Sequence, residues 1–278
     1  MVKIKSEQSK VLKEIFGKEW KKIPLVNKLK IPTIGVEIKG GDIIGLGLYN
    51  IVLTTLPESI GNLKSLERLY LPANPLTTLP ESIGNLTSLQ ILDLRWSDLS
   101  TLPESIDNLT SLQILNLEEN NLTTLPESIG TLKSLESLNL NSNKLTTLPE
   151  SIGNLSSLKD LHLADNKLIT LPKSIENLKS LQELSLGSNK FTILPESIGT
   201  LKSLQRLWVN DNQLSTLPES IGNLSLLQEL WLGDNPLMIL PDMIKVLEQR
   251  GVSIFKASLE GAPKYSLKEK IRKNFRLE

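Results

Sequence analysis

Leucine recurs along most of this chain in one fixed pattern, and the spacing changes halfway through each copy. In the copy over residues 135–157, Leu138 and Leu140 alternate with polar residues. Their side chains point the same way in an extended chain, because side chains in a strand repeat every two residues. Pro149 then ends the extended run and suits the first turn of a short helix, which carries Ile152 and the leucine three residues later. Each copy therefore predicts a short strand, a turn and a helical return.

The pattern has a period of 23 residues and covers most of the chain. A degenerate first copy begins at Ile43. Eight fuller copies follow, beginning at Leu66, Leu89, Leu112, Leu135, Leu158, Leu181, Leu204 and Leu227. The apolar residues of one copy cannot be buried within 23 residues, so neighbouring copies must stack and share one continuous core. The periodicity therefore predicts a repeat solenoid of the α/β class.

An asparagine marks the ninth position of most copies. The series is Asn74, Asn120, Asn143, Asn166, Asn189, Asn212 and Asn235. A buried side-chain amide at a turn can bond backbone groups of its own coil and of the adjacent coil, and leaving such groups unpaired costs about 1–3 kcal/mol each. We therefore expect a structural ladder of amides, interrupted where Ile51 and Ser97 take the asparagine's place.

Taken together, these positions read LxxLxLxxNxLTxLPxSIGNLxx, which resembles the leucine-rich repeat family. The similarity spans Ile43 to Gln249 and is closest to the intracellular 23-residue class found in Ras-group leucine-rich repeat proteins and in bacterial and archaeal repeat proteins. The resemblance implies a horseshoe whose concave side is a parallel β-sheet and whose convex side carries short helical turns. It implies no single partner, although a small GTPase or its regulator is a partner worth testing.

The two ends depart from the repeat and predict caps, so we divide the chain into residues 1–42, 43–249 and 250–278. In the first segment, Ser6 can cap a helix that ends at Gly17, with its apolar side formed by Val11, Leu12, Ile15 and Phe16. An extended lead-in strand follows over Gly35–Ile38.

The last segment predicts a strand and then an amphipathic helix. Val252, Ile254 and Phe255 fit the strand. The helix would begin at Ser266, with apolar residues Leu267, Ile271 and Phe275 and basic residues Lys268, Lys270, Arg272, Lys273 and Arg276. We interpret it as a docked cap; contact with an acidic membrane or with a partner is the alternative.

The amino-acid composition disfavours several classes of function. The chain has 31 basic and 31 acidic residues, a balance that disfavours nucleic-acid binding, and it has no cysteine for disulfides or thiolate metal sites. His162 is the only histidine, so a general base, a metal cluster or a nucleophilic triad lacks its usual partners. No apolar run approaches the roughly 18–20 residues of a membrane helix. We expect a cytoplasmic monomer with no membrane insertion, no catalytic residues, no cofactor and no metal.

The candidate binding residues lie in the variable columns of the concave face and along its edges. Trp208 and Trp231 occupy the same position in adjacent copies, so their side chains should sit about 5 Å apart as an aromatic platform. Trp231 could instead be covered by the C-terminal cap and Tyr70 by the N-terminal one. The acidic residues of these columns fit a basic partner, or a solvated surface. The full set is Trp208, Trp231, Arg206, Asp211, Glu229, Asp234, Glu183, His162, Trp96, Arg95 and Tyr70.

These features favour a non-enzymatic protein–protein interaction scaffold that binds its partner on the concave face. Two alternatives remain: a regular structural module without a selected partner, and a hydrolase that uses concave carboxylates such as Glu183 or Asp211. The register further predicts that Leu163 is in the core and that His162 is exposed.

Overall fold

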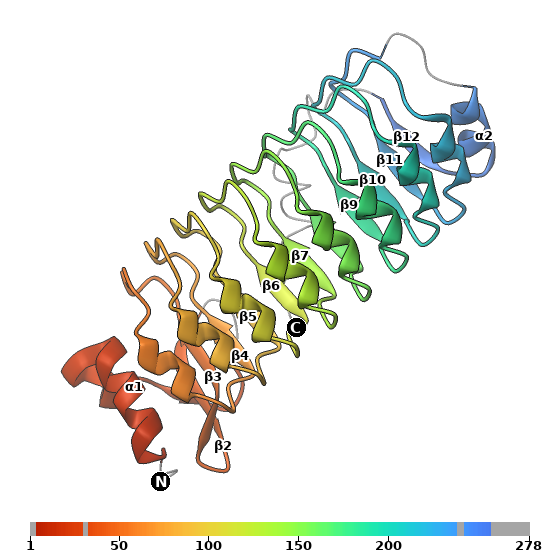
Figure 1. Ribbon diagram of the computed structural model, residues 1–278. Coiled ribbons are helices and arrows are strands. Elements are labelled where there is room, and N and C mark those ends of the chain that lie inside the picture. Colours follow the sequence, from red (N-terminus) through yellow and green to blue (C-terminus); the bar gives the residue numbers. More distant parts are fainter. Residues whose placement is uncertain (1–3, 30–32, 238–241, 257–278) are drawn as a thin grey trace.

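The computed structural model describes residues 4–29, 33–237 and 242–256. Its strands form one open sheet of twelve, in which each strand lies beside its neighbours in sequence, and all pairs are parallel except β2 with β3. Coils stack along one axis, with strands on one side and helical turns on the other (Figure 1). The predicted solenoid horseshoe is confirmed. The strands are β1 Leu25–Val26, β2 Ile34–Lys39, β3 Asp42–Leu48, β4 Arg68–Tyr70, β5 Ile91–Asp93, β6 Ile114–Asn116, β7 Ser137–Asn139, β8 Asp160–His162, β9 Glu183–Ser185, β10 Arg206–Trp208, β11 Glu229–Trp231 and β12 Ser253–Phe255.

The helical returns are mostly tight 3-10 turns. They are η1 Gly17–Lys22, η2 Glu58–Asn62, η3 Glu81–Asn85, η4 Glu104–Asn108, η5 Glu127–Thr131, η6 Glu150–Asn154, η7 Lys173–Asn177, η8 Glu196–Thr200 and η9 Glu219–Asn223, with α-helices α1 Ser6–Phe16 and α2 Met243–Gln249 at the ends. Pro149 precedes η6 with φ −68° and ψ 150°, so it caps the turn from an extended conformation and does not form its first residue. The prediction of a proline inside the first turn was wrong, because the fixed φ of proline suits both conformations and ψ decides between them.

Repeated leucines fill one continuous core. Leu138, Leu140 and Leu163 are fully buried, as are Ile152 and Leu155 from the helical returns. Because each strand from β4 to β12 contributes only three residues, the core is built between coils and not within them, as expected for a solenoid.

The asparagine ladder is confirmed. The Asn143 amide nitrogen donates to the Leu117 carbonyl of the preceding coil at 2.9 Å and to the Leu140 carbonyl at 3.1 Å, while its oxygen accepts from the Leu122 N–H at 3.0 Å. At Ser97 the ladder is interrupted: within the described residues, the Ser97 hydroxyl has no hydrogen-bond partner. The amides thus connect successive coils wherever they occur.

Glycines set the spacing of the helical turns. A Cβ added at Gly153 would lie 2.3 Å from the Ser174 carbonyl oxygen of the next coil, so a side chain there would force the coils apart. Asp107 and Glu176 take the glycine's place in two copies, and at both the turn packs less closely on the following one. Glycine at this position therefore allows the closest stacking on the convex side.

Both ends adopt atypical structure. Helix α1 packs against η2, and Val11 and Leu12 enter the core; it ends as predicted at Gly17, where φ is +57°. Its cap position is Lys5 without a side-chain bond, so the expected cap at Ser6 was wrong by one residue. Strands β2 and β3 form an unpredicted hairpin around Gly40 and Gly41, whose φ values of 61° and 84° suit glycine.

At the C-terminal end, β12 forms the expected last strand after α2. The Arg250 guanidinium donates to the Gly222 and Leu224 carbonyls, which ties α2 to the preceding coil. The basic amphipathic helix expected over residues 266–276 lies outside the described residues.

One residue of the first coil has a strained backbone. Val52 has φ +58° and is 72% exposed. A β-branched residue is disfavoured in the left-handed region, where the cost is about 1–2 kcal/mol. Val52→Asn is therefore expected to raise the free energy of unfolding by about 1 kcal/mol, measured by urea denaturation. Ile169→Asn, an exposed site without positive φ, is the control and should give no gain; equal effects would contradict the assignment.

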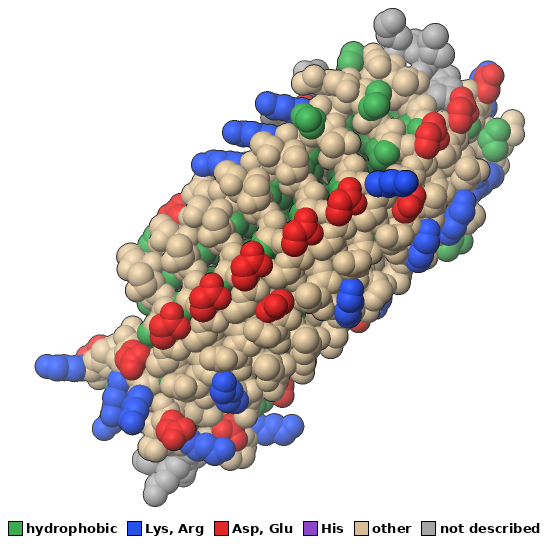
Figure 2. Space-filling model, in the orientation of Figure 1, with side chains coloured by type: hydrophobic (Ala, Val, Ile, Leu, Met, Phe, Trp, Pro, Cys, Tyr) green, Lys and Arg blue, Asp and Glu red, His purple; other side chains and the backbone are tan. Residues whose placement is uncertain are grey.

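A row of acidic side chains follows the helical-turn side of the solenoid (Figure 2). Glu81, Glu127 and Glu196 each accept a hydrogen bond from the backbone N–H of a serine in the next coil. Glu150 does the same, with its oxygens 3.0 Å from the Ser174 nitrogen and 3.2 Å from the Lys173 nitrogen. These carboxylates cap the first N–H groups of the neighbouring turn, a role that the sequence pattern did not reveal.

This capping makes stability depend on pH. The backbone N–H of Ser174 lowers the pKa of Glu150 below its ordinary value of 4.5. A carboxyl with a depressed folded-state pKa contributes fully above its unfolded pKa and loses that contribution as pH falls through the folded one. The difference in unfolding free energy between wild type and Glu150→Gln should be constant from pH 7 to about 5 and shrink below that, in urea titrations at each pH. A difference independent of pH would contradict the capping role.

Candidate functional site

The aromatic cluster at the C-terminal end of the concave face lies on β10, β11 and β12. Trp208, Trp231 and Phe255 are Cα partners across these strands, which confirms the predicted register of the two tryptophans. The rings of Trp231 and Phe255 stack with centroids 3.8 Å apart and an interplanar angle of 13°. The Trp231 indole N–H donates to the Glu229 carboxylate at 3.1 Å. Sequence reasoning placed Phe255 in the last strand but did not join it to this site, although the strand register held the signal.

Trp208 is not part of an exposed platform. It is 4% exposed, so the expectation of an open contact surface at this residue was wrong. It lies between the strands of Ser185 and Trp231, where side chains of adjacent strands cover one another at a spacing of about 4.8 Å. Trp231 is half-buried, and Phe255, at the sheet edge, is 37% exposed. Accessible aromatic surface is therefore concentrated on Trp231 and Phe255.

A charged group next to this cluster centres on Arg206, which forms an ion pair with Glu183 on the neighbouring strand. Burial raises the pKa of Asp160, and the Arg206 guanidinium opposes this rise. Burial, and then the Arg206 charge, lowers the pKa of His162 to about 4. His162 is 0% exposed, so the prediction of a surface histidine was wrong. It lies between Asn139 and Ser185 in the concave column.

The second candidate spot, near the N-terminal half, is mostly buried. Arg95 forms a buried ion pair with Asp93 at 2.7 Å, and burial raises the pKa of Asp93 against the opposing effect of Arg95. The Arg95 guanidinium also lies 5.0 Å from the ring centroid of half-buried Trp96. Tyr70 is buried as well, which raises its pKa to about 12. Arg95 and Tyr70 are thus not exposed contact residues.

Models of known families match the same coils. The model described as "Leucine-rich repeat region" matches residues 45–119, 82–168 and 108–193, and the model "Leucine Rich Repeat" matches residues 203–224. The chain belongs to the leucine-rich repeat family. A comparison with curated proteins gives no significant match.

Solved leucine-rich repeat structures resemble this chain at low identity. One is PEPR1–AtPEP1, with 28% identity, a TM-score of 0.68, and coverage of 90% of this chain and 41% of that one. Another is the plant peptide hormone receptor RGFR1 in complex with RGF2, with 29% identity, a TM-score of 0.65, and coverage of 77% and 35%. The ectodomain of the Arabidopsis thaliana receptor kinase GASSHO1/SCHENGEN3, in complex with CASPARIAN STRIP INTEGRITY FACTOR 2, has 30% identity, a TM-score of 0.58, and coverage of 73% and 28%. The chain thus spans less than half of each of these three chains.

Two predicted acids lie at the edge of the leucine-rich repeat sheet. Asp211 and Asp234 occupy the turn after the strand, where φ is +55° and +58°. Both are exposed, and Asp211 accepts a hydrogen bond from the Ser188 hydroxyl at 2.7 Å. Left-handed residues recur at this position in the other coils, so these acids belong to the turn geometry and border the concave face.

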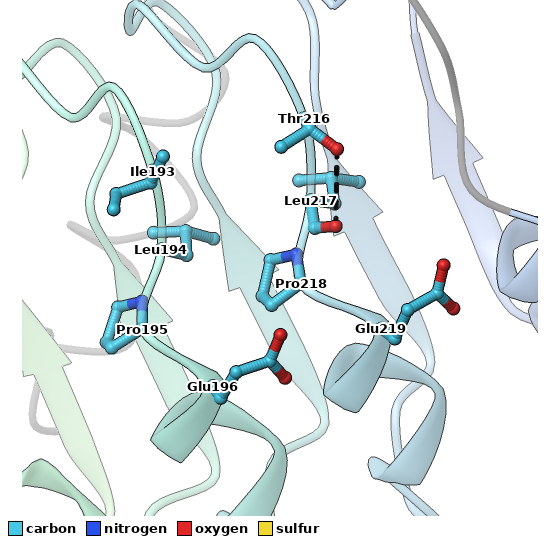
Figure 3. Close-up of a pocket in the computed structure, with 8 residues that line it drawn as sticks. All are labelled: Ile193, Leu194, Pro195, Glu196, Thr216, Leu217, Pro218 and Glu219. Carbon is cyan, nitrogen blue, oxygen red and sulfur yellow. Dashed lines mark hydrogen bonds between the residues drawn. The ribbon is translucent and has the colours of Figure 1, made fainter.

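A separate open groove of about 480 Å³ lies between two coils, beside the segments that lead into η8 and η9. It is lined by Ile193, Leu194, Pro195, Glu196, Thr216, Leu217, Pro218 and Glu219 (Figure 3). Glu196 already caps the next turn through the Ser220 N–H. The lining residues do not place several polar groups around one point. We therefore interpret the groove as a gap between repeats.

The chemistry of these surfaces suits non-covalent binding. In the part of the chain that the structure describes, no three metal-ligating side chains of the His, Cys, Asp and Glu types come together. Among the helices of residues 4–29, 33–237 and 242–256, none combines the length and apolar character needed to cross a bilayer. Aromatic stacking beside a carboxylate and a guanidinium is typical of a protein contact surface.

Proposed function

We propose that this leucine-rich repeat chain is a non-enzymatic interaction module that binds a polypeptide partner on its concave face. The stacked pair of Trp231 and Phe255 carries the proposal. It combines accessible aromatic surface with the Glu229 carboxylate at the C-terminal end of the sheet, and large aromatic side chains next to charged groups supply most binding hot spots.

The architecture supports a polypeptide partner. Related solved structures include a receptor in complex with RGF2 and an ectodomain in complex with CASPARIAN STRIP INTEGRITY FACTOR 2. This chain spans only 35% and 28% of those chains. We therefore carry over only the class of partner, a polypeptide, and not the identity of the two ligands. From the resemblance to Ras-group proteins we also propose a small GTPase or its regulator as the first partner to test, a cytoplasmic location and a monomeric state.

Alanine at both aromatic positions tests the site. Wild type, Trp231→Ala/Phe255→Ala and Ile193→Thr are used as baits in the source cells, and any partner enriched by wild type is purified and titrated by calorimetry. Ile193 lines the groove between coils, and its substitution by threonine restores the residue found at this position in most copies, so it is the matched control. Loss of both rings should weaken binding at least tenfold, from hot-spot contributions of about 2 kcal/mol.

The control should bind with unchanged affinity. An unchanged dissociation constant for the double alanine variant, with an intact circular dichroism spectrum, would contradict the site. The absence of any saturable partner, together with very high thermal stability, would favour the alternative of a purely structural module.

A further inference from the structure

The first described segment of the chain is basic, whereas the coils that follow it are acidic. Residues 4–29 contain seven lysines against three glutamates, a net charge of +4. Residues 33–256 contain 16 basic and 25 acidic residues, a net charge of −9. Helix α1, which belongs to the basic segment, lies at one end of the stacked coils, and η1 packs against it (Figure 1). The N-terminal end of the stack therefore has the opposite charge to the coils beside it.

Four lysines and one tryptophan form a cluster at this end. Lys13 on α1 and Lys21 on η1 place their ammonium nitrogens 5.6 and 5.9 Å from the centroid of the Trp20 ring. Lys10 lies one turn before Lys13, and Lys18 lies one turn before Lys21, so each pair shares a side of its helix. All four lysines are exposed, and among the described residues none of them forms an ion pair. Their mutual repulsion favours an anionic ligand.

The glutamates of the same segment do not neutralise this lysine–tryptophan cluster. Glu14 accepts a hydrogen bond from the Ser59 hydroxyl of the first coil, and Glu19 forms an ion pair with Lys22. Glu7 lies in the first turn of α1, where a negative charge stabilises the helix dipole. The positive potential around the tryptophan therefore remains.

The side chains of this end suit a lipid surface. Trp20 is half-buried and packs against the leucine core, so its ring is held in place. Leu25, on the edge strand β1 of the same segment, is 55% exposed. Tryptophan is enriched at the membrane–water interface, and the long apolar stem of lysine brings its ammonium group to the phosphates of the lipids. Exposed apolar area beside lysines thus favours anionic lipid over a purely acidic protein.

We propose that residues 4–29 dock this protein on an anionic membrane surface, with the lysine–tryptophan cluster against the lipid phosphates. The coils, with a net charge of −9, are repelled by the same surface, so the solenoid stands with its N-terminal end toward the membrane. The contact is peripheral and requires no helix to cross the bilayer. It leaves the concave face accessible and does not depend on the proposed function.

Vesicle flotation tests the contact on the full chain. Wild type should bind phosphatidylcholine vesicles with about 30% phosphatidylserine and should not bind pure phosphatidylcholine, because each lysine near an anionic surface strengthens partitioning about fivefold. Lys10→Gln/Lys13→Gln/Lys21→Gln, which changes exposed side chains only, should weaken binding about 100-fold. Lys10→Arg/Lys13→Arg/Lys21→Arg keeps the charge and should bind like wild type.

Two control variants remove three positive charges elsewhere. They are Lys144→Gln/Lys167→Gln/Lys190→Gln in three adjacent coils and Lys268→Gln/Lys270→Gln/Lys273→Gln in the sequence after β12. Charges further from the membrane than the Debye length of about 8 Å are screened, so both controls should weaken binding by less than about fivefold. A loss in either control as large as in the glutamine variant of the cluster would overturn the proposal.

The nature of the ligand is tested in the same assay. No binding of wild type to the anionic vesicles would overturn the proposal. Saturable binding of soluble poly-glutamate that the cluster variant loses, without binding to vesicles, would overturn it in favour of an acidic protein partner.

Brominated lipids test the position of Trp20, because bromine quenches the fluorescence of tryptophans that reach the acyl region. Anionic vesicles of this kind should quench wild type, and Trp20→Phe, which keeps an apolar ring against the core, should lose most of the quenching. Trp231→Phe at the far end of the sheet is the matched control and should keep it. Equal quenching in the two variants, or a loss in Trp231→Phe alone, would show that another part of the chain contacts the lipid.

Discussion

Leu163→Ala is expected to lower the free energy of unfolding by about 2–5 kcal/mol. Leu163 is fully buried and follows directly after β8, in the middle of the continuous leucine core. Removing its side chain loses the transfer free energy of the buried methyl groups and leaves a cavity that stacked coils on both sides cannot easily close. Urea denaturation followed by circular dichroism measures the change.

Ile169→Ala is the control, because Ile169 is 59% exposed in the same coil. Its effect should stay within about 0.5 kcal/mol. Equal effects at the two positions would show that the assigned register is wrong. Because stability in a solenoid is nearly a sum over neighbouring repeats, the loss should also increase hydrogen exchange in the central coils before the terminal ones.

Asn166→Ala is expected to cost about 3 kcal/mol, from several groups that each lose about 1–3 kcal/mol. The Asn166 amide nitrogen donates to the Leu140 carbonyl at 2.9 Å and to the Leu163 carbonyl at 3.1 Å, and its oxygen accepts from the Leu145 N–H at 3.0 Å. Alanine would leave these backbone groups buried and unpaired at the contact between two coils. Thermal and urea denaturation both measure the loss.

The matched control is Asn154→Ala, an exposed asparagine at the end of η6. It should change stability by less than about 0.5 kcal/mol. A small effect at Asn166 would mean that water replaces the amide in the ladder, and the ladder would then not connect the coils energetically.

Function in this molecule depends on side chains that stability does not require. The leucines and asparagines repeat because each coil must match the next, whereas Trp231, Phe255 and Glu229 interrupt the regularity at one end of the concave face. We expect binding at a surface that departs from the repeat and does not contribute to the leucine core. The proposed variants distinguish the effects of this surface from the effects of the core positions.

Sequence periodicity was sufficient to predict the coils and their contents. The burial of Leu138 and Ile152, the ladder at Asn143 and its interruption at Ser97 all follow from contacts between identical neighbours one period apart. The residues that make these contacts recur in every copy of the 23-residue repeat, so the sequence shows the same pattern many times. The strand at Phe255 lies outside the repeat, and its apolar residues Val252, Ile254 and Phe255 predicted it separately.

Only the tertiary structure decided which concave side chains are accessible. Arg95, His162 and Trp208 occupy variable positions that the register places outside the leucine core, yet they are buried. Their burial depends on the ion pair of Arg95 with Asp93 and on unlike side chains of the adjacent strands, neither of which recurs with the period. The sequence by itself determined which residues face the core, because the direction of a side chain follows from local spacing. The exposure of side chains on the opposite face was decided only by the assembled sheet, because exposure depends on how unlike side chains of neighbouring strands pack together.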